Sequence, residues 1–181
     1  MRPEGGWTAD SISYVHPQPD GAPDAWTAEA RQLGRTGSQQ LLRVGEVDSP
    51  PAVEPLLGAR SVLRRRLILL DGAPVEIADS YYPCELAVGT ALAEPLKIRG
   101  GAPTLLASLG CAPAELVEEL TVRPAGAAEA HLLGVGAGSA VVELVRATRD
   151  AGGRPYEVAV MVMRPEGRVF RYRMAMGAES A

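Results

Sequence analysis

The chain has 181 residues, of which 46% are hydrophobic, and a formal net charge of −4 at pH 7. This length allows one substantial hydrophobic core, whereas the negative charge offers no long-range attraction to nucleic acid. No stretch approaches the roughly 20 apolar residues of a membrane-spanning helix, and no signal peptide is evident, so we expect a cytoplasmic protein. Cys84 and Cys111 form neither a disulfide framework nor a zinc motif, and buried thiols are expected.

The first part of the chain is expected to be an arm that precedes the main domain. Proline and glycine are frequent before residue 24, which favours irregular structure. From Asp24, the stretch DAWTAEARQLG combines a helix cap, helix-forming residues and a Gly stop, and predicts a short helix. We assign residues 1–37 to this arm, residues 38–176 to the main domain and residues 177–181 to a tail. A strand over residues 38–47 and a short helix over residues 51–57 open the domain.

The central stretch, residues 60–83, predicts a β-hairpin. Two apolar arms flank Asp71-Gly72-Ala73-Pro74, which is typical of a tight turn. Strand alternation places Arg64 and Arg66 on one face of the first arm, among apolar neighbours. Because an unpaired buried charge is costly, these guanidinium groups need an anionic partner. That partner is either a carboxylate on the returning arm, Glu76 or Asp79, or a bound ligand.

The rest of the chain predicts more strands and a few short helices. A turn or short helix begins at Pro83, and a second helix is expected over residues 103–110. The Gly-Gly-Ala-Pro-Thr stretch at its start leaves backbone N–H groups free. This start is either a place where an anion is held or an ordinary junction between a loop and a helix. We then expect a strand over residues 114–123, a helix over residues 126–133 and a hairpin with arms 140–148 and 155–164. A last strand over residues 168–174 would complete the sheet. This order predicts an α+β domain in which helices cover one face of an antiparallel sheet. A ligand would lie either between the sheet and the helices or in the mouth of the curved sheet.

The two hairpins resemble each other. Arg66, Asp71, Gly72, Pro74 and Glu76 of the first correspond to Arg146, Asp150, Gly153, Pro155 and Glu157 of the second. Similar turn chemistry produces such a match by chance as well, so the pattern is weak evidence for an internal repeat.

Motifs for phosphate, dinucleotide or metal binding and for nucleophilic catalysis are missing from the sequence. His16 and His131 have no second histidine at ligand spacing, so neither a metal nor a cofactor is predicted. What remains is a set of charged residues within apolar strands, which are either members of structural ion pairs or site residues. The set comprises Arg64, Arg66, Glu76, Asp79, Glu143, Arg146 and Glu157.

Several stretches together resemble the UTRA domain, the effector-binding domain of the HutC branch of GntR transcription regulators. They are RRRLILLDGAPVEIADSYYP, PTLLASLG, AELVEELTVRPA and VVELVRATRDAGGRPYEVAVMVMRPEGRVFRYRM, within residues 38–175. The preceding arm resembles the linker of actinobacterial members. The resemblance implies the chorismate-lyase-like fold, with a six-stranded antiparallel sheet flanked by short helices.

The resemblance also implies a ligand pocket, with departures. Arg66 matches the first arginine of an R-x-R pair, and Ile68 stands at the second. A glutamate of the returning arm is replaced by Ala78 with Asp79 beside it, Glu157 matches the glutamate after the late turn, and Met163 stands where sugar-phosphate-sensing members carry an aromatic residue. The implied ligand is largely apolar with one acidic or polar group. The predicted ligand-binding residues are Arg64, Arg66, Ile68, Asp79, Thr104, Glu157 and Met163.

Two functions follow from this resemblance. The first is a small-molecule-binding effector domain of a regulator. The alternative is an enzyme of lyase, isomerase or cyclase type, in which Arg66 and Glu157 would be catalytic, since the fold is shared with chorismate lyase. The winged helix-turn-helix of a GntR regulator would precede the linker, so this chain alone is expected not to bind DNA. A homodimer is expected because exposed strand edges favour self-pairing.

Overall fold

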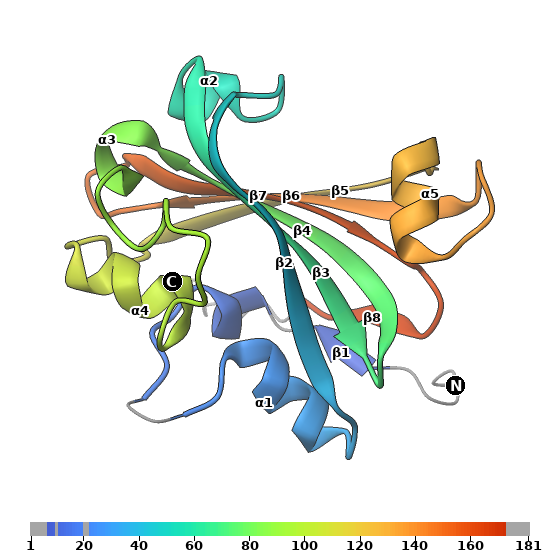
Figure 1. The fold of residues 1–181 in the computed structure, drawn as a ribbon. Helices are drawn as coiled ribbons and strands as arrows, with labels where there is room; N and C mark the ends of the chain where they lie inside the picture. Colours follow the sequence, from blue (N-terminus) through green and yellow to red (C-terminus); the bar gives the residue numbers. More distant parts are fainter. Residues whose placement is uncertain (1–6, 10, 20–21, 173–181) are drawn as a thin grey trace, which may run out of the picture.

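A six-stranded antiparallel sheet forms the centre of the molecule, in the order β2-β3-β4-β7-β6-β5 (Figure 1). The computed structural model describes residues 7–9, 11–19 and 22–172. The strands are β2 (Gly37–Asp48), β3 (Arg60–Leu70), β4 (Ala73–Pro83), β5 (Glu115–Pro124), β6 (Ala140–Arg149) and β7 (Pro155–Met163). The predicted strand over residues 38–47, both arms of each hairpin and the strand over residues 114–123 are present within a few residues of their expected bounds, and the α+β class is confirmed.

Helices lie against both faces of this sheet (Figure 1), which corrects the expectation that one face alone is covered. On one face lie η1 (Ser11–Tyr14), α1 (Ala25–Gln32) and α4 (Gly101–Ser108), while α2 (Glu54–Leu57) and α5 (Ala127–Leu133) cover the other, and α3 (Cys84–Ala87) follows β4 at the end of the sheet. The reason is that both sets of alternating strand residues are apolar. Ile68 packs with Trp26 of α1, and Leu67, one residue earlier, packs with Leu133 of α5. Within the described ranges, no helix is both long and apolar enough to cross a membrane.

The predicted central hairpin closes through a two-residue turn. Asp71 and Gly72 both have positive φ angles, of 51° and 79°, as the tight turn between twisted strands requires. The carboxylate of Asp71 accepts hydrogen bonds from Thr36 N at 2.8 Å and from Arg35 Nε at 2.7 Å. The turn is therefore tied to the chain that enters β2.

The last strand does not join the main sheet, and this part of the prediction was wrong. β8 (Arg168–Phe170) pairs in parallel with β1 (Trp7–Ala9) in a separate two-stranded sheet. A turn after β7, in which Arg168 N donates to Pro165 O at 3.2 Å, directs the chain away from the edge of the main sheet. Residues 173 and 174 of the predicted strand and the tail at 177–181 lie outside the described residues.

The two hairpins occupy corresponding places in the sheet. From the seam between β4 and β7, the order outward is β4-β3-β2 on one side and β7-β6-β5 on the other. Arg66 of β3 and Arg146 of β6 are thus related positions in the two halves. This order agrees with the internal correspondence noted in the sequence.

Candidate functional site

A cavity of about 130 Å³ lies between the sheet and the segments that cover it, namely η1, α1 and the start of α4. The floor of the cavity is formed by small side chains of the two middle strands. They are Ala78 of β4 and Ala159 of β7. In register, Ala78 lies between Arg66 and Met161, and Ala159 lies between Ser80 and Arg146. Short side chains at the seam with long ones on either side leave a hollow over the centre of the sheet.

The position of α1, which forms one wall, depends on a close approach to β2. A Cβ atom at Gly37 would lie 2.8 Å from the Ala30 Cβ and 2.9 Å from the Trp26 Nε1, so a side chain there would push the helix away. The Trp26 Nε1 donates to Leu69 O at 3.0 Å, which ties α1 to the hairpin. Asp24 caps α1 by accepting from Thr27 N at 3.0 Å, as its sequence predicted.

Arg64 anchors the segment at residues 91–96 to β3, a contact that could not be predicted from the sequence. Its Nη1 donates to the carbonyl oxygens of Ala91, Leu92 and Glu94 at 3.1, 3.0 and 2.7 Å, and its Nη2 donates to that of Leu96 at 2.8 Å. Burial lowers the pKa of Arg64, and the nearby Arg66 charge adds to this lowering. Arg64 does not line the 130 Å³ cavity but borders an adjoining one of about 280 Å³, which shares Arg66 and Tyr82 with the first.

Arg66 lines the cavity, and its partner is neither of the two carboxylates considered from the sequence. Its Nη2 donates to Ser80 Oγ at 3.0 Å, while its buried Nε has no hydrogen-bond partner among the described residues. Glu76 instead accepts from Arg168 Nη1 at 2.8 Å. Hydrogen-bonding capacity of Arg66 thus remains open toward the cavity.

Asp79 lies on the opposite face of β4, so its predicted place in the pocket is corrected. Since Ala78 faces the cavity, strand alternation turns Asp79 away from it. There it accepts from Arg65 Nε at 2.7 Å, and only 8% of its side chain is exposed. The Arg65–Asp79 contact is therefore a structural ion pair and not part of the ligand site.

Glu157 lines the cavity and is 6% exposed. The hydroxyl of Tyr82 donates to its Oε1 at 3.0 Å. Burial raises the pKa of Tyr82, and the Glu157 carboxylate raises it further, so the hydroxyl stays protonated as a donor. The other carboxylate oxygen remains able to accept a hydrogen bond from a ligand.

The remaining predicted site residues divide between the cavity and the scaffold. Ile68 and Met163 line the cavity. Thr104 does not: its hydroxyl donates to the carbonyl oxygen of Gly100, the residue before α4, at 2.8 Å and accepts from Gln18 N at 3.4 Å. The helix itself begins at Gly101 rather than at Pro103. Pro103 and residues 100–102 reach the cavity.

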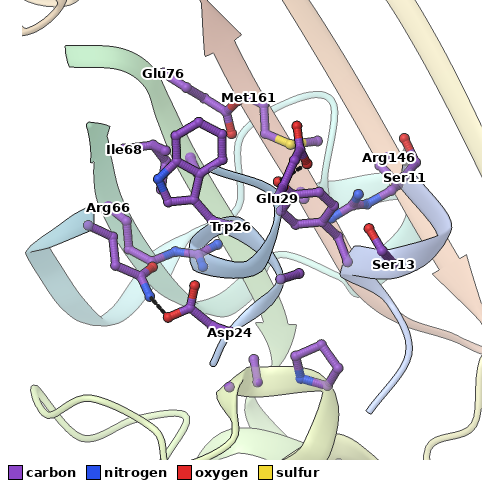
Figure 2. A pocket seen from close by; sticks show the side chains of 18 of the residues that line it. Ser11, Ser13, Asp24, Trp26, Glu29, Arg66, Ile68, Glu76, Arg146 and Met161 are labelled. Carbon is purple, nitrogen blue, oxygen red and sulfur yellow. Dashed lines mark hydrogen bonds between the residues drawn. The ribbon is translucent and has the colours of Figure 1, made fainter. Parts of the chain in front are cut away.

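Other cavity residues had not been predicted from the sequence. Trp26, Glu29 and Tyr14 come from the N-terminal arm, and Figure 2 shows Trp26 and Glu29 over the cavity. The Tyr14 hydroxyl donates to Glu29 Oε2 at 2.6 Å. No local signal links an arm to a distant sheet, so sequence patterns did not reveal these contacts. Arg146, by contrast, had a signal, because it is the counterpart of Arg66 in the second hairpin.

The six-stranded antiparallel sheet thus carries a concave cavity lined by both apolar and charged side chains, which is typical of small-molecule-binding sites. The profile of the UTRA domain family matches residues 32–167, and the chain belongs to this family. It is therefore an effector-binding domain, and this finding supports effector binding over the enzyme alternative.

Similar proteins agree with this assignment. The chain is 33% identical, over 152 residues, to the uncharacterised HTH-type transcriptional regulator SCO4628 of Streptomyces coelicolor, and the match covers 79% of this chain but 56% of that protein. The chain thus spans little more than half of that relative. PhnF from Mycobacterium smegmatis has a similar structure, with a TM-score of 0.74 at 21% identity over 88% of this chain and 72% of PhnF. The C-terminal domain of Yurk from Bacillus subtilis gives 0.63 at 18% identity, over 73% of this chain and 92% of that domain. These two likenesses concern the fold.

Proposed function

We propose that this chain is the effector-binding part of a GntR-family transcription regulator and that its cavity binds a largely apolar small molecule with one acidic or polar group. The observation that carries the proposal is the composition of the cavity wall. Ile68, Met161 and Met163 offer apolar surface, while Arg66 and Glu157 present charged groups to the same enclosed space. Met side chains adapt to ligand shape, which suits a sensor pocket.

The first test replaces the two polar contacts. Arg66→Ala and Glu157→Gln should each weaken ligand binding about tenfold or more, because a charge-assisted hydrogen bond in an apolar enclosure contributes about 1.5–3 kcal/mol. Ligands would first be found by screening a library of small metabolites for those that raise the melting temperature. Calorimetric titration of each hit then gives the affinity of every variant.

A matched control and a melting curve separate this proposal from a purely structural role. Arg43 is exposed on β2 and outside the cavity, so Arg43→Ala should bind each hit as the unchanged protein does. If Arg66→Ala and Glu157→Gln lose stability but keep full affinity, the two residues have a structural role and do not contact the ligand. A library without any stabilising compound would count against the sensor function itself.

We also propose a homodimer formed through the free edge of β5. Among the described strands, β5 pairs with β6 alone, and it exposes 46% of Val117, 38% of Leu120 and 72% of Val122. An edge strand of this kind favours pairing with another chain. The other edge strand, β2, contains a register shift between Leu41 and Arg43, which disfavours regular pairing.

Val122→Lys is expected to convert the dimer to a monomer, because a lysine on an edge strand opposes strand pairing. Light scattering should then show the 19.0 kDa monomer instead of twice that mass. The same replacement at Val88, which is 54% exposed after α3, is the control and should leave the dimer intact. A protein that is monomeric before any substitution would contradict this proposal.

A further inference from the structure

Arg146 is a buried charge to which the described residues offer no hydrogen-bond or ion-pair partner. It is 7% exposed and lines the cavity, and no hydrogen bond or ion pair joins it to another residue in the described part of the chain. Its Nε in particular is buried and unpaired. In register it lies opposite Glu118 on β5, yet the two side chains form no ion pair; Glu118 accepts instead from the Tyr172 hydroxyl at 3.1 Å. The side chain of Arg146 therefore extends into the cavity and does not pair with the carboxylate that lies opposite it on β5.

A guanidinium group in this position requires a partner. Arginine stays protonated in proteins, and burying an unpaired charge is costly. The carboxylates of the cavity already have donors of their own, since Glu157 accepts from Tyr82, Glu29 from Tyr14 and Glu76 from Arg168. Buried polar atoms without partners in native proteins commonly mark the place of a bound water, ion or ligand.

Arg66 faces Arg146 across the same hollow. Three strand spacings separate β3 from β6, which amounts to roughly 14 Å between their backbones. Figure 2 shows the two side chains entering the cavity from opposite sides. The floor between them carries the short side chains of Ala78 and Ala159. Two long cationic side chains thus extend over a recess that no described side chain fills.

We propose that Arg146 and Arg66 together bind the oxyanion group of a small organic acid, with the apolar part of that acid against Met161 and Met163. This inference rests on the proposed effector-binding function and narrows its ligand from polar or acidic to acidic. A guanidinium group matches the geometry of carboxylate and phosphoryl oxygens. The cavity volume of about 130 Å³ exceeds the volume for one enclosed water roughly tenfold, so the ligand has on the order of ten non-hydrogen atoms.

The test uses three probes of similar shape: phenylacetate, phenylphosphonate and the neutral phenylacetamide. Calorimetric titration and melting curves should show that at least one of the two acids binds and stabilises the protein, whereas the amide does not. Whichever of the two acids binds more tightly shows whether the site prefers a carboxylate or a phosphoryl group. Arg146→Gln should weaken binding of that acid about tenfold to a hundredfold, as expected for the loss of a charge-assisted contact. Arg43→Gln, on the exposed surface of β2, should leave it unchanged.

Three results would overturn the two-arginine site: neither acid binds at millimolar concentration, the amide binds as tightly as the acids, or Arg146→Gln keeps full affinity. If Arg146→Gln does not fold, Arg146→Lys serves in its place. It keeps the charge but loses the planar fork, and it should bind the acid more weakly than the unchanged protein. Equal affinity of Arg146→Lys and the unchanged protein would likewise overturn the site. If neutral library compounds bind through Arg66, the two-arginine site is refuted but the effector-binding function is not. If no library compound binds at all, the effector-binding function is refuted.

Discussion

Arg64→Ala is expected to lower the free energy of unfolding by about 3 kcal/mol or more, because it removes a charged donor from four buried or partly buried carbonyl groups. The segment at residues 91–96 then loses its tie to β3, and its carbonyl oxygens must find water. For a chain of this size, the melting temperature should fall by roughly 6–12 °C. Thermal unfolding followed by circular dichroism measures this change.

Two other variants sharpen the result. Arg64→Lys should recover part of the loss, because lysine supplies a charge but cannot direct two nitrogens to separate carbonyl groups. Arg43→Ala, on the exposed face of β2, should melt within a few degrees of the unchanged protein. If Arg64→Ala melts like Arg43→Ala, the hydrogen bonds to the loop do not stabilise the fold.

Ala159→Leu should abolish ligand binding while the domain remains folded. Ala159 is 2% exposed on the floor of the cavity, and a leucine there would occupy the space that a ligand needs. Since the added carbon atoms enter a hollow rather than a packed core, stability should change by less than about 1 kcal/mol. We expect affinity for any ligand of the cavity to fall at least about a hundredfold, a loss of about 2.7 kcal/mol or more, and calorimetric titration measures it.

The matched replacement is Ala130→Leu on α5. Ala130 is 4% exposed and packs with Leu67, Ile77 and Leu133 on the opposite face of the sheet. Overpacking there should cost about 1–3 kcal/mol of stability and leave the affinity unchanged. Full ligand binding by Ala159→Leu would show that the ligand lies elsewhere.

Much of the fold followed from local patterns in the sequence. Alternating apolar residues and the Asp71-Gly72 turn predicted the central hairpin, and both depend on interactions between residues close in the chain. The cap at Asp24 likewise predicted the start of α1. The pairing of β8 with β1 did not follow, because it joins segments about 160 residues apart and only three residues long.

The site was predictable to the extent that strand alternation determines it. Alternation placed Arg66 on the cavity face, where it lies, and the same rule should have placed Asp79 on the other face once Ala78 was assigned to the pocket. Whether Arg64 contacts a ligand or a loop depends on the distant carbonyl groups at residues 91–96, which no pattern around Arg64 encodes. The contributions of Glu29 and Trp26 depend on how the arm packs against the sheet.

The short β1–β8 ribbon has a kinetic consequence for access to the cavity. Its strands have three residues each; β8 itself contributes Arg168 and Phe170 to the cavity wall, and the neighbouring η1 contributes Ser11. Small units of this kind detach in local fluctuations that cost far less free energy than global unfolding. A ligand would enter and leave through such openings, with the six-stranded sheet intact. Exchange rates would then be governed by the strength of this ribbon, while equilibrium affinity would be governed by the side chains over the floor.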